Sequence, residues 1–173
     1  MVPWVALSYR LPREPSRLRL AVWRRLKRLG AVLLHESLWL LPADASTREA
    51  LEWMAEEIEE QGGTAYVWDL MSLSQVQDQD IVGRFRADAN ARYAAILASV
   101  RALQRLRGGA RRALSTKHKQ ARRRLATVER ALRLAQRRDH FRAPGRQAAE
   151  QAIRDAARAL DESLAVERSR RSA

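Results

Sequence analysis

Cysteine is absent from this chain of 173 residues. Its absence excludes disulfide bonds, a thiolate nucleophile and every zinc site that uses cysteine ligands. The three histidines are scattered along the chain and show no ligand spacing, and imidazole binds a metal only where other ligands converge on it. The sequence has no glycine-rich phosphate loop and no Ser/His/Asp set. We therefore expect no metal, no cofactor, no catalytic residues and no enzymatic activity.

Long hydrophobic runs are also absent. No apolar run reaches the 18 residues typical of a membrane-spanning helix. The N-terminal apolar run is too short for a signal peptide and has no basic residues before it. We expect a cytoplasmic protein that does not bind membranes. The apolar share of 46% is that of a globular chain, and the length allows one medium domain or two small ones.

Acidic residues are scarce in the second half of the chain, and this is its most informative feature. Residues 1–73 contain 9 basic and 10 acidic residues, whereas residues 74–173 contain 24 and 10, a net charge of +14. Of the basic residues, 30 are arginine and 3 are lysine. Arginine forms bidentate hydrogen bonds with phosphate and other oxyanions, which lysine does not. The asymmetry indicates a polyanionic partner: DNA, RNA or an anionic surface.

Residues 1–73 alternate between short apolar runs and stretches with helical spacing. The runs predict strands at residues 2–11, 31–36, 37–43 and 64–73, and the spacing predicts helices from Ser16 and from Asp44 or Ser46. Gly30 and Gly62 are placed to end these helices. The resulting β-α-β-β-α-β order is that of a ferredoxin-like domain, an antiparallel sheet with both helices on one face. The other face must be covered by another element or lie open to water.

Residues 74–168 show helical spacing throughout. Apolar residues recur at intervals of three and four in three stretches, which are interrupted near residues 108–109 and 143–145. The recurring positions include Tyr93 and Val100 in the first stretch and Ile153 in the third. In the middle stretch, from Leu114 to Ala135, the intervals alternate strictly, which is the heptad spacing of a coiled coil. The sequence predicts an α+β protein with a ferredoxin-like domain at residues 1–73 and a basic, coiled-coil-like helical domain at residues 74–173. The three helices either pack antiparallel or form the arms of a dimer.

The middle helix carries the strongest functional signal. Outside its heptad positions nearly all charged residues are basic, whereas a solvated helix face usually mixes signs. The candidate DNA-binding residues are Arg111, Arg112, Lys117, Lys119, Arg122, Arg123, Arg124, Arg130, Arg133 and Arg137. The alternative is that acidic residues elsewhere neutralise them, and the glutamate-rich helix at residues 49–60 is the obvious internal candidate.

A second basic group surrounds the start of the first helix. Arg10, Arg13, Arg17 and Arg19 flank Ser16. A helix N-terminus offers free backbone N–H groups and arginines supply forked donors, so this group is a candidate site for a small oxyanion. The alternative is a solvated face. The five tryptophans all lie in residues 1–73, and we expect them to pack in the core and on the sheet, with a cofactor cage as the lesser alternative.

Three stretches together resemble the N-terminal region of ChrB, a regulator of chromate resistance. They read PSRLRLAVWRRLKRLGA at residues 15–31, SLWLLPA at residues 37–43 and EWMAEEIEEQGGTAYVW at residues 52–68. The resemblance is close over residues 4–68 and looser over the basic helices. It implies a cytoplasmic bacterial protein tied to chromate resistance, commonly through transcriptional control of a chromate-efflux operon. Longer members carry a further C-terminal domain, so we expect either a stand-alone DNA binder or an accessory protein that does not sense.

A more distant resemblance is to the central domain of PaaX-type repressors, and through it to a CRISPR spacer-acquisition endonuclease. That nuclease family places a metal-binding aspartate at the end of the first strand. Here Ser8, Tyr9 and Arg10 occupy this place, and a divalent metal needs oxygen ligands that they do not supply. We therefore expect no nuclease activity.

The sequence thus predicts a DNA-binding transcriptional regulator associated with chromate resistance. It would act as a homodimer, bind DNA through the arginine-rich helix and have chromate as a candidate effector. The alternative is an accessory protein or enzyme that binds chromate without binding DNA.

Overall fold

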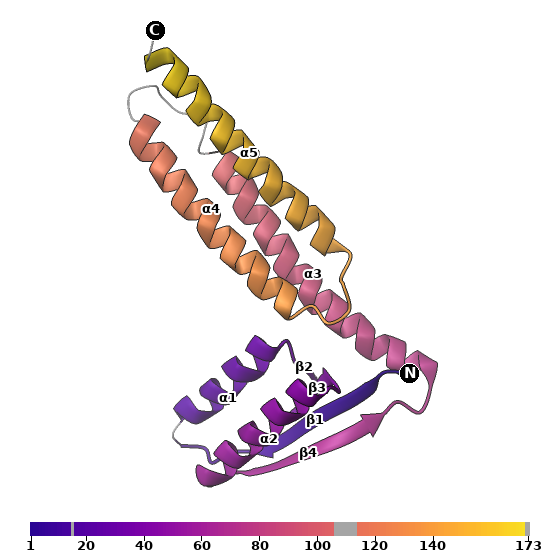
Figure 1. The fold of residues 1–173 in the computed structure, drawn as a ribbon. Coiled ribbons are helices and arrows are strands. Elements are labelled where there is room, and N and C mark those ends of the chain that lie inside the picture. Colours follow the sequence, from indigo (N-terminus) through magenta and orange to yellow (C-terminus); the bar gives the residue numbers. More distant parts are fainter. Residues whose placement is uncertain (15, 106–113, 172–173) are drawn as a thin grey trace. The chain divides into compact units, whose positions relative to one another are not determined.

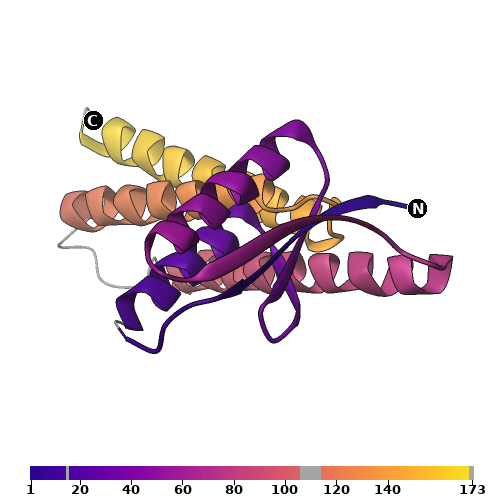
Figure 2. The ribbon, with the colours of Figure 1, turned by 90° about the horizontal axis from the view of Figure 1, so that it is seen from below.

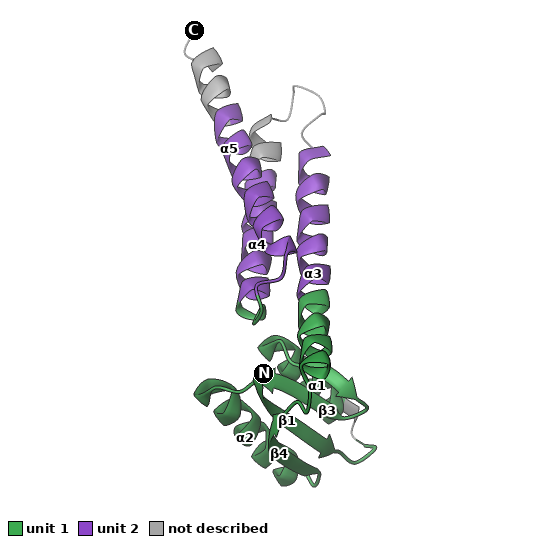
Figure 3. Cartoon of the chain, turned by 90° about the vertical axis from the view of Figure 1, so that its right-hand side faces the viewer, with its two compact units in different colours: residues 1–88, 137–141 green, residues 89–136, 142–173 purple. Residues whose placement is uncertain are grey.

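The computed structural model describes residues 1–14, 16–105 and 114–171, and the side chains of these except residues 16, 114–118 and 164–171. The chain forms two compact units. The sheet unit contains residues 1–88 and 137–141, and the helical unit contains residues 89–136 and 142–173 (Figure 3). The sheet unit thus also includes residues 74–88 and 137–141, which follow its last strand.

The sheet unit contains four strands and two complete helices. They are β1 (Pro3–Arg10), α1 (Ser16–Leu29), β2 (Val32–His35), β3 (Leu38–Pro42), α2 (Ala45–Glu60) and β4 (Thr64–Met71). All neighbouring strands are antiparallel, in the order β2-β3-β1-β4. A tight turn with Glu36 at φ +38° joins β2 to β3, and the two strands form a hairpin (Figure 2).

Local sequence explains where the helices begin and end. Asp44 caps α2: its carboxylate accepts from the backbone N–H of Thr47 at 2.8 Å, and the Thr47 hydroxyl accepts from the Asp44 N–H at 2.9 Å. Gly30 ends α1 at φ +80°, in the left-handed region that favours glycine. A Cβ at Gly30 would also lie 2.7 Å from the carbonyl oxygen of Arg138. Both predicted stop positions of α1 and α2 are confirmed.

One face of the sheet is covered by α1 and α2 (Figure 1). Its buried cluster joins strand residues such as Val5, Leu7 and Leu41 to Leu26 of α1 and Met54 of α2, all of them fully buried. The strands alternate between the two faces, so the residues between these belong to a different core.

The second face is covered by the beginning of α3 (Gln75–Arg105) and by the segment that follows α4. Trp4 is 1% exposed and stacks on Phe85 of α3 with ring centroids 5.5 Å apart, and Phe141 packs against both rings. Asp78 anchors the start of α3, because its carboxylate accepts from the Trp4 indole and the Val2 N–H at 3.0 Å each. The face left open by the sequence prediction is therefore covered from within the same unit.

The helical unit contains most of α3 together with α4 (Leu114–Arg137) and α5 (Gly145–Arg171). The three helices run alternately up, down and up, which is the antiparallel arrangement (Figure 1). Their shared core contains apolar residues of all three helices. Its buried members include Tyr93 and Val100 of α3, Leu125 of α4, and Ile153 and Leu160 of α5.

Core packing is found for two of the five tryptophans. Trp4 and Trp39 are buried, but the side chains of Trp23, Trp53 and Trp68 are 46%, 60% and 48% exposed. Each exposed tryptophan lies on an element whose inward positions are filled by other apolar residues, so its element is anchored without it. Surface tryptophans need an explanation other than packing within the chain.

Candidate functional site

α4 separates an apolar face from a basic one. Its composition is dominated by alanine, leucine, arginine and glutamine, which are strong helix formers, and it contains neither glycine nor proline. Leu125 and Ala135 are buried, and Ala121, Val128 and Leu132 pack against the same core. The apolar face is thus committed to the helical unit, which leaves the opposite face to solvent.

Five basic residues form a single row on that opposite face, which we call the α4 stripe. With 3.6 residues per turn they all lie on the side away from Leu125 and Ala135. The stripe comprises Lys119, Arg123, Arg130, Arg133 and Arg137, and each of these side chains is exposed. The row extends over about 27 Å at 1.5 Å per residue. A duplex carries one phosphate charge for about every 1.7 Å of its axis, so a row of this length meets many phosphates.

Few of these cations are neutralised. Among the described residues, the ion pairs of α4 involve one carboxylate, Asp161 of α5, which pairs with Arg122. Arg130 donates to the hydroxyl of Thr127 at 3.1 Å, which leaves its charge uncompensated. The α2 glutamate whose ion pair is described, Glu57, pairs with Arg25 of α1.

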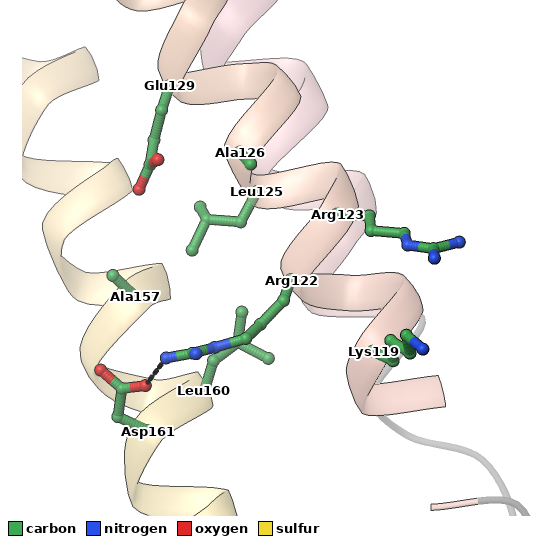
Figure 4. Close-up of a pocket in the computed structure, with 9 residues that line it drawn as sticks. All are labelled: Lys119, Arg122, Arg123, Leu125, Ala126, Glu129, Ala157, Leu160 and Asp161. Atoms are coloured by element: carbon green, nitrogen blue, oxygen red, sulfur yellow. Dashed lines mark hydrogen bonds and ion pairs between the residues drawn. The ribbon is translucent and has the colours of Figure 1, made fainter. Parts of the chain in front are cut away.

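Arg122 has a structural role that the sequence prediction missed. It lies beside a cavity of about 640 Å³ between α4 and α5, over apolar residues that include Leu125, Ala157 and Leu160. Its guanidinium reaches across to Asp161, whereas Arg123 points away from α5 (Figure 4). Arg122 therefore links two helices, and Arg123 is available to an outside partner.

The remaining predicted DNA-binding residues are placed differently. Arg124 is exposed, but by helix geometry it lies on the flank of α4 away from the stripe. Lys117 belongs to α4, while the position of its side chain lies outside the description. Arg111 and Arg112 lie outside the described residues altogether.

The predicted oxyanion group lies in the sheet unit. Arg10 is the last residue of β1, Arg13 is in the connection that follows, and Arg17 and Arg19 are in the first turn of α1. All four side chains are exposed. The Arg19 guanidinium donates to the carbonyl oxygens of Pro12, at 2.9 Å, and Arg13. Arg19 thus fastens the loop before α1, and three arginines are left without such a contact among the described residues.

Carboxylates of both units are held in their charged form. Burial raises the pKa of Asp78, but hydrogen bonds from the Val2 N–H, the Trp4 indole and the Ser72 hydroxyl outweigh it, so the pKa lies below the usual value. In the helical unit, the hydrogen bond from Arg146, followed by that from Gln136, lowers the pKa of Glu150. Glu150 thereby joins the Gln136 amide of α4 to α5 at 2.7 Å. These groups hold elements together and are not arranged as an acid–base pair.

Neither a metal centre nor a membrane span emerges from the described residues. No group of three or more His, Asp or Glu side chains among them is arranged to hold a metal ion. None of the described helices is long and apolar enough to cross a membrane.

Comparison with known proteins decides the family. The model of the family described as protein ChrB, N-terminal, matches residues 19–167. The chain belongs to the ChrB N-terminal family. The match includes α1 from Arg19, the sheet residues from β2 onward and all of α4, so the α4 stripe lies within the family region. ChrB membership associates the chain with the regulation of chromate resistance. The searches of curated proteins and of solved structures gave no match.

Proposed function

We propose that this ChrB-family chain is a cytoplasmic, DNA-binding transcriptional regulator of chromate resistance, and that the α4 stripe is its phosphate-binding surface. The observation that supports the proposal is the row of exposed cations on α4. Among the described residues, the one ion pair of α4 is that between Arg122 and Asp161, and Arg122 lies outside the row. Helix folding does not require such a row, and mixed charges would stabilise α4 better. The role is binding, without a chemical step.

The mechanism is electrostatic. Each stripe cation that neutralises a phosphate releases condensed counterions, which favours association at low salt. Arginine adds forked hydrogen bonds to phosphate oxygens, which fix the orientation of the duplex without reading its sequence. Base readout is not assigned to any residue.

The proposal extends to the architecture. The β-α-β-β-α-β order, with both helices on one sheet face, supports a ferredoxin-like assignment for the sheet unit. The heptad residues in the shared core support coiled-coil-like packing of α3, α4 and α5. We also propose that the chain acts as a homodimer, as regulators that bind two half-sites do.

A titration of duplex DNA at several salt concentrations tests the stripe. The variant Arg123→Ala/Arg130→Ala should bind more weakly to every sequence. Its slope of log K against log salt should be shallower by about 1.8, because each lost phosphate contact removes about 0.9. The matched control is Arg24→Ala/Arg28→Ala, which removes two exposed arginines from α1 and should leave the slope unchanged. Equal effects of both variants would mean that DNA binding depends only on net charge, and would contradict the assignment of the α4 stripe as the phosphate-binding surface.

Chromate remains a candidate effector. It is a tetrahedral dianion. In the predicted group, the guanidinium of Arg19 is bonded to the loop, whereas no hydrogen bond of the guanidinium groups of Arg10, Arg13 and Arg17 is found among the described residues. Calorimetry of chromate binding to the wild type and to Arg13→Ala/Arg17→Ala tests this site. We expect the variant to bind more weakly, and sulfate to compete. Equal binding by both proteins, or by neither, removes the site.

A further inference from the structure

The two edges of the sheet differ in how well they are protected against pairing with another strand. At one edge, β2 has four residues and an irregular register between Leu33 and His35. A short, bulged edge strand resists pairing with another chain. At the other edge, β4 has eight residues and pairs with β1 without a break, from Pro3 opposite Met71 to Arg10 opposite Thr64. Its second edge has no strand beside it among the described residues.

β4 also lacks the side chains that usually guard an edge. From Thr64 to Met71 it contains no proline, lysine or arginine. Its one charged residue, Asp69, forms an ion pair with Arg48 of α2 at 2.7 Å. Natural edge strands avoid association by means of charges, prolines or bulges, and β4 has none of these except a charge that is already compensated.

The sheet face next to this edge is apolar and uncovered. Tyr66, Trp68 and Leu70 are 59%, 48% and 37% exposed. They pair across β1 with Ser8, Ala6 and Trp4, so they lie on the same face as the buried Ala6 and Trp4. The cover that α3 and Phe141 provide therefore ends before it reaches β4. The strip continues into Leu73 and Val76, which are 96% and 78% exposed.

The aromatic rings of this strip are held in place before any partner arrives. The Trp68 indole donates to the hydroxyl of Ser8 at 3.0 Å, and the rings of Tyr66 and Trp68 lie 6.0 Å apart at 45°. Fixed aromatic side chains lose little conformational entropy on binding, so such a surface binds at low cost.

The geometry points to a second copy of this chain as the occupant, with the two β4 strands paired antiparallel across a two-fold axis. A register with Trp68 opposite its own copy keeps both strips on one face. It places Tyr66 opposite Leu70 of the second copy and Asp69 opposite Val67. The two carboxylates are thus not opposite each other, and aromatic–aliphatic cross-strand pairs are formed. This inference rests on the homodimer in the proposed function and assigns it a surface.

The size and charge of the strip favour this partner. At roughly 200 Å² for each aromatic side chain, Tyr66 and Trp68 alone leave about 200 Å² exposed. Leu70, Leu73 and Val76 add to it, towards the 800 Å² or so that each partner contributes to a standard interface. A surface that stacks single-stranded nucleic acid would need a row of cations beside its aromatic rings. Residues 64–83, which carry the strip, contain no cation, and the neighbouring strand β1 contains only Arg10, at its end opposite Thr64.

The test is the mass of the full chain in solution without DNA, measured by light scattering. We expect a dimer for the wild type and a monomer for Tyr66→Ser/Trp68→Ser with an unchanged circular dichroism spectrum. The matched control Trp53→Ser removes an equally exposed tryptophan from α2 and should remain dimeric. A monomeric wild type, or a Tyr66→Ser/Trp68→Ser variant that remains dimeric, would overturn the inference. Because no DNA is present in this measurement, neither result tests DNA binding by the α4 stripe.

Cross-linking supplies an independent measurement, since the chain has no cysteine of its own. Paired antiparallel residues bring their Cα atoms to about 4.5–5.5 Å, which is within disulfide range. Under oxidation, Trp68→Cys should form a covalent dimer and Trp53→Cys should not. Equal cross-linking of both variants would overturn the pairing. So would loss of single-stranded DNA binding by Tyr66→Ser/Trp68→Ser at unchanged mass, which would make the strip a base-stacking surface.

Discussion

The sheet unit and the helical unit differ in how far their basic side chains form ion pairs. In the sheet unit, basic side chains of α1, α2 and α3 meet carboxylates: Arg25 pairs with Glu57, Lys27 with Asp88 and Arg48 with Asp69. In the helical unit, α4 contains eight basic residues and has one described ion pair, that of Arg122. Charge is therefore balanced in the sheet unit and left unbalanced on α4.

The cores of the two units differ as well. The sheet unit packs Trp4, Phe85 and Phe141 together and fastens them with the Asp78 carboxylate. The core of the helical unit contains many alanines, which allow close approach of α3, α4 and α5. All five tryptophans lie in residues 1–73, so tryptophan fluorescence reports on the sheet unit, whereas circular dichroism reports largely on the long helices. Fluorescence and circular dichroism therefore allow the unfolding of the two units to be followed separately.

Phe85→Ala should have the largest effect. It removes the ring that stacks on Trp4, and truncation of a buried phenylalanine costs about 3–5 kcal/mol of the free energy of unfolding. Urea unfolding followed by tryptophan fluorescence measures it. Leu103→Ala, at a buried position of α3 in the helical unit, is the control that should act mainly on the dichroism signal. A loss below about 1 kcal/mol for Phe85→Ala would contradict the covering role of α3.

Gly30→Ala should come next. A non-glycine residue in the left-handed region costs about 1–2 kcal/mol, and here the added Cβ would also lie 2.7 Å from the Arg138 carbonyl oxygen. We expect a lower melting temperature on the fluorescence signal. Gly62→Ala is the matched control, because Gly62 also has a positive φ but has no atom within 4 Å of an added Cβ. Equal losses for the two variants would mean that contact with Arg138 contributes nothing.

Asp78→Asn should lower stability in a pH-dependent way. The pKa of Asp78 is lowered in the folded chain, so its stabilising contribution is present above the ordinary value of 3.8 and is lost as the pH falls below it. We expect the variant to melt below the wild type at pH 7 and the difference to shrink as the pH approaches 3. Melting curves at several pH values check this. A difference that is independent of pH would indicate that the charge of Asp78 is unimportant.

Arg122→Ala should have the smallest effect on stability. The Arg122–Asp161 pair is more than half exposed on both sides, and such pairs contribute about 0.2–1 kcal/mol. Its neighbour Arg123 provides the contrast. Arg123→Ala should leave stability unchanged and make the salt slope of DNA binding shallower, whereas Arg122→Ala should change the slope less. Identical slopes for the two variants would remove the distinction between a bridging and a free arginine.

Much of the secondary structure could be predicted, because local residues determine it. Gly30 ends α1 by its positive φ, and Asp44 caps α2 through Thr47, and both devices are visible in the sequence. The heptad positions likewise identified Tyr93, Val100 and Ile153 as core residues. Such patterns tell which side of an element faces inward.

Local sequence patterns do not tell which other element packs against that inward side. The sequence left one sheet face without a cover, and the structure supplies Phe85 and Phe141, which come from segments far apart in the chain. It also predicted Trp68 in the core, because an apolar strand at an edge has the same alternation as one in the middle of a sheet. In the candidate site, the basic face of α4 was predicted from composition, but the engagement of Arg122 with Asp161 depends on how α5 packs.

The segment after α4 has a consequence for how the chain is made. Arg138 and His140 contact the last carbonyl oxygens of α1, those of Arg28 and Leu29, at 3.2 and 3.0 Å, across 110 and 111 residues of sequence. The end of α1 and the ring cluster around Trp4 are therefore incomplete while only residues 1–88 have left the ribosome. At about 5–20 residues per second, residue 141 follows some 3–10 s later. During that interval the nascent sheet exposes the surface that Phe141 later covers, and this is when a chaperone would find it.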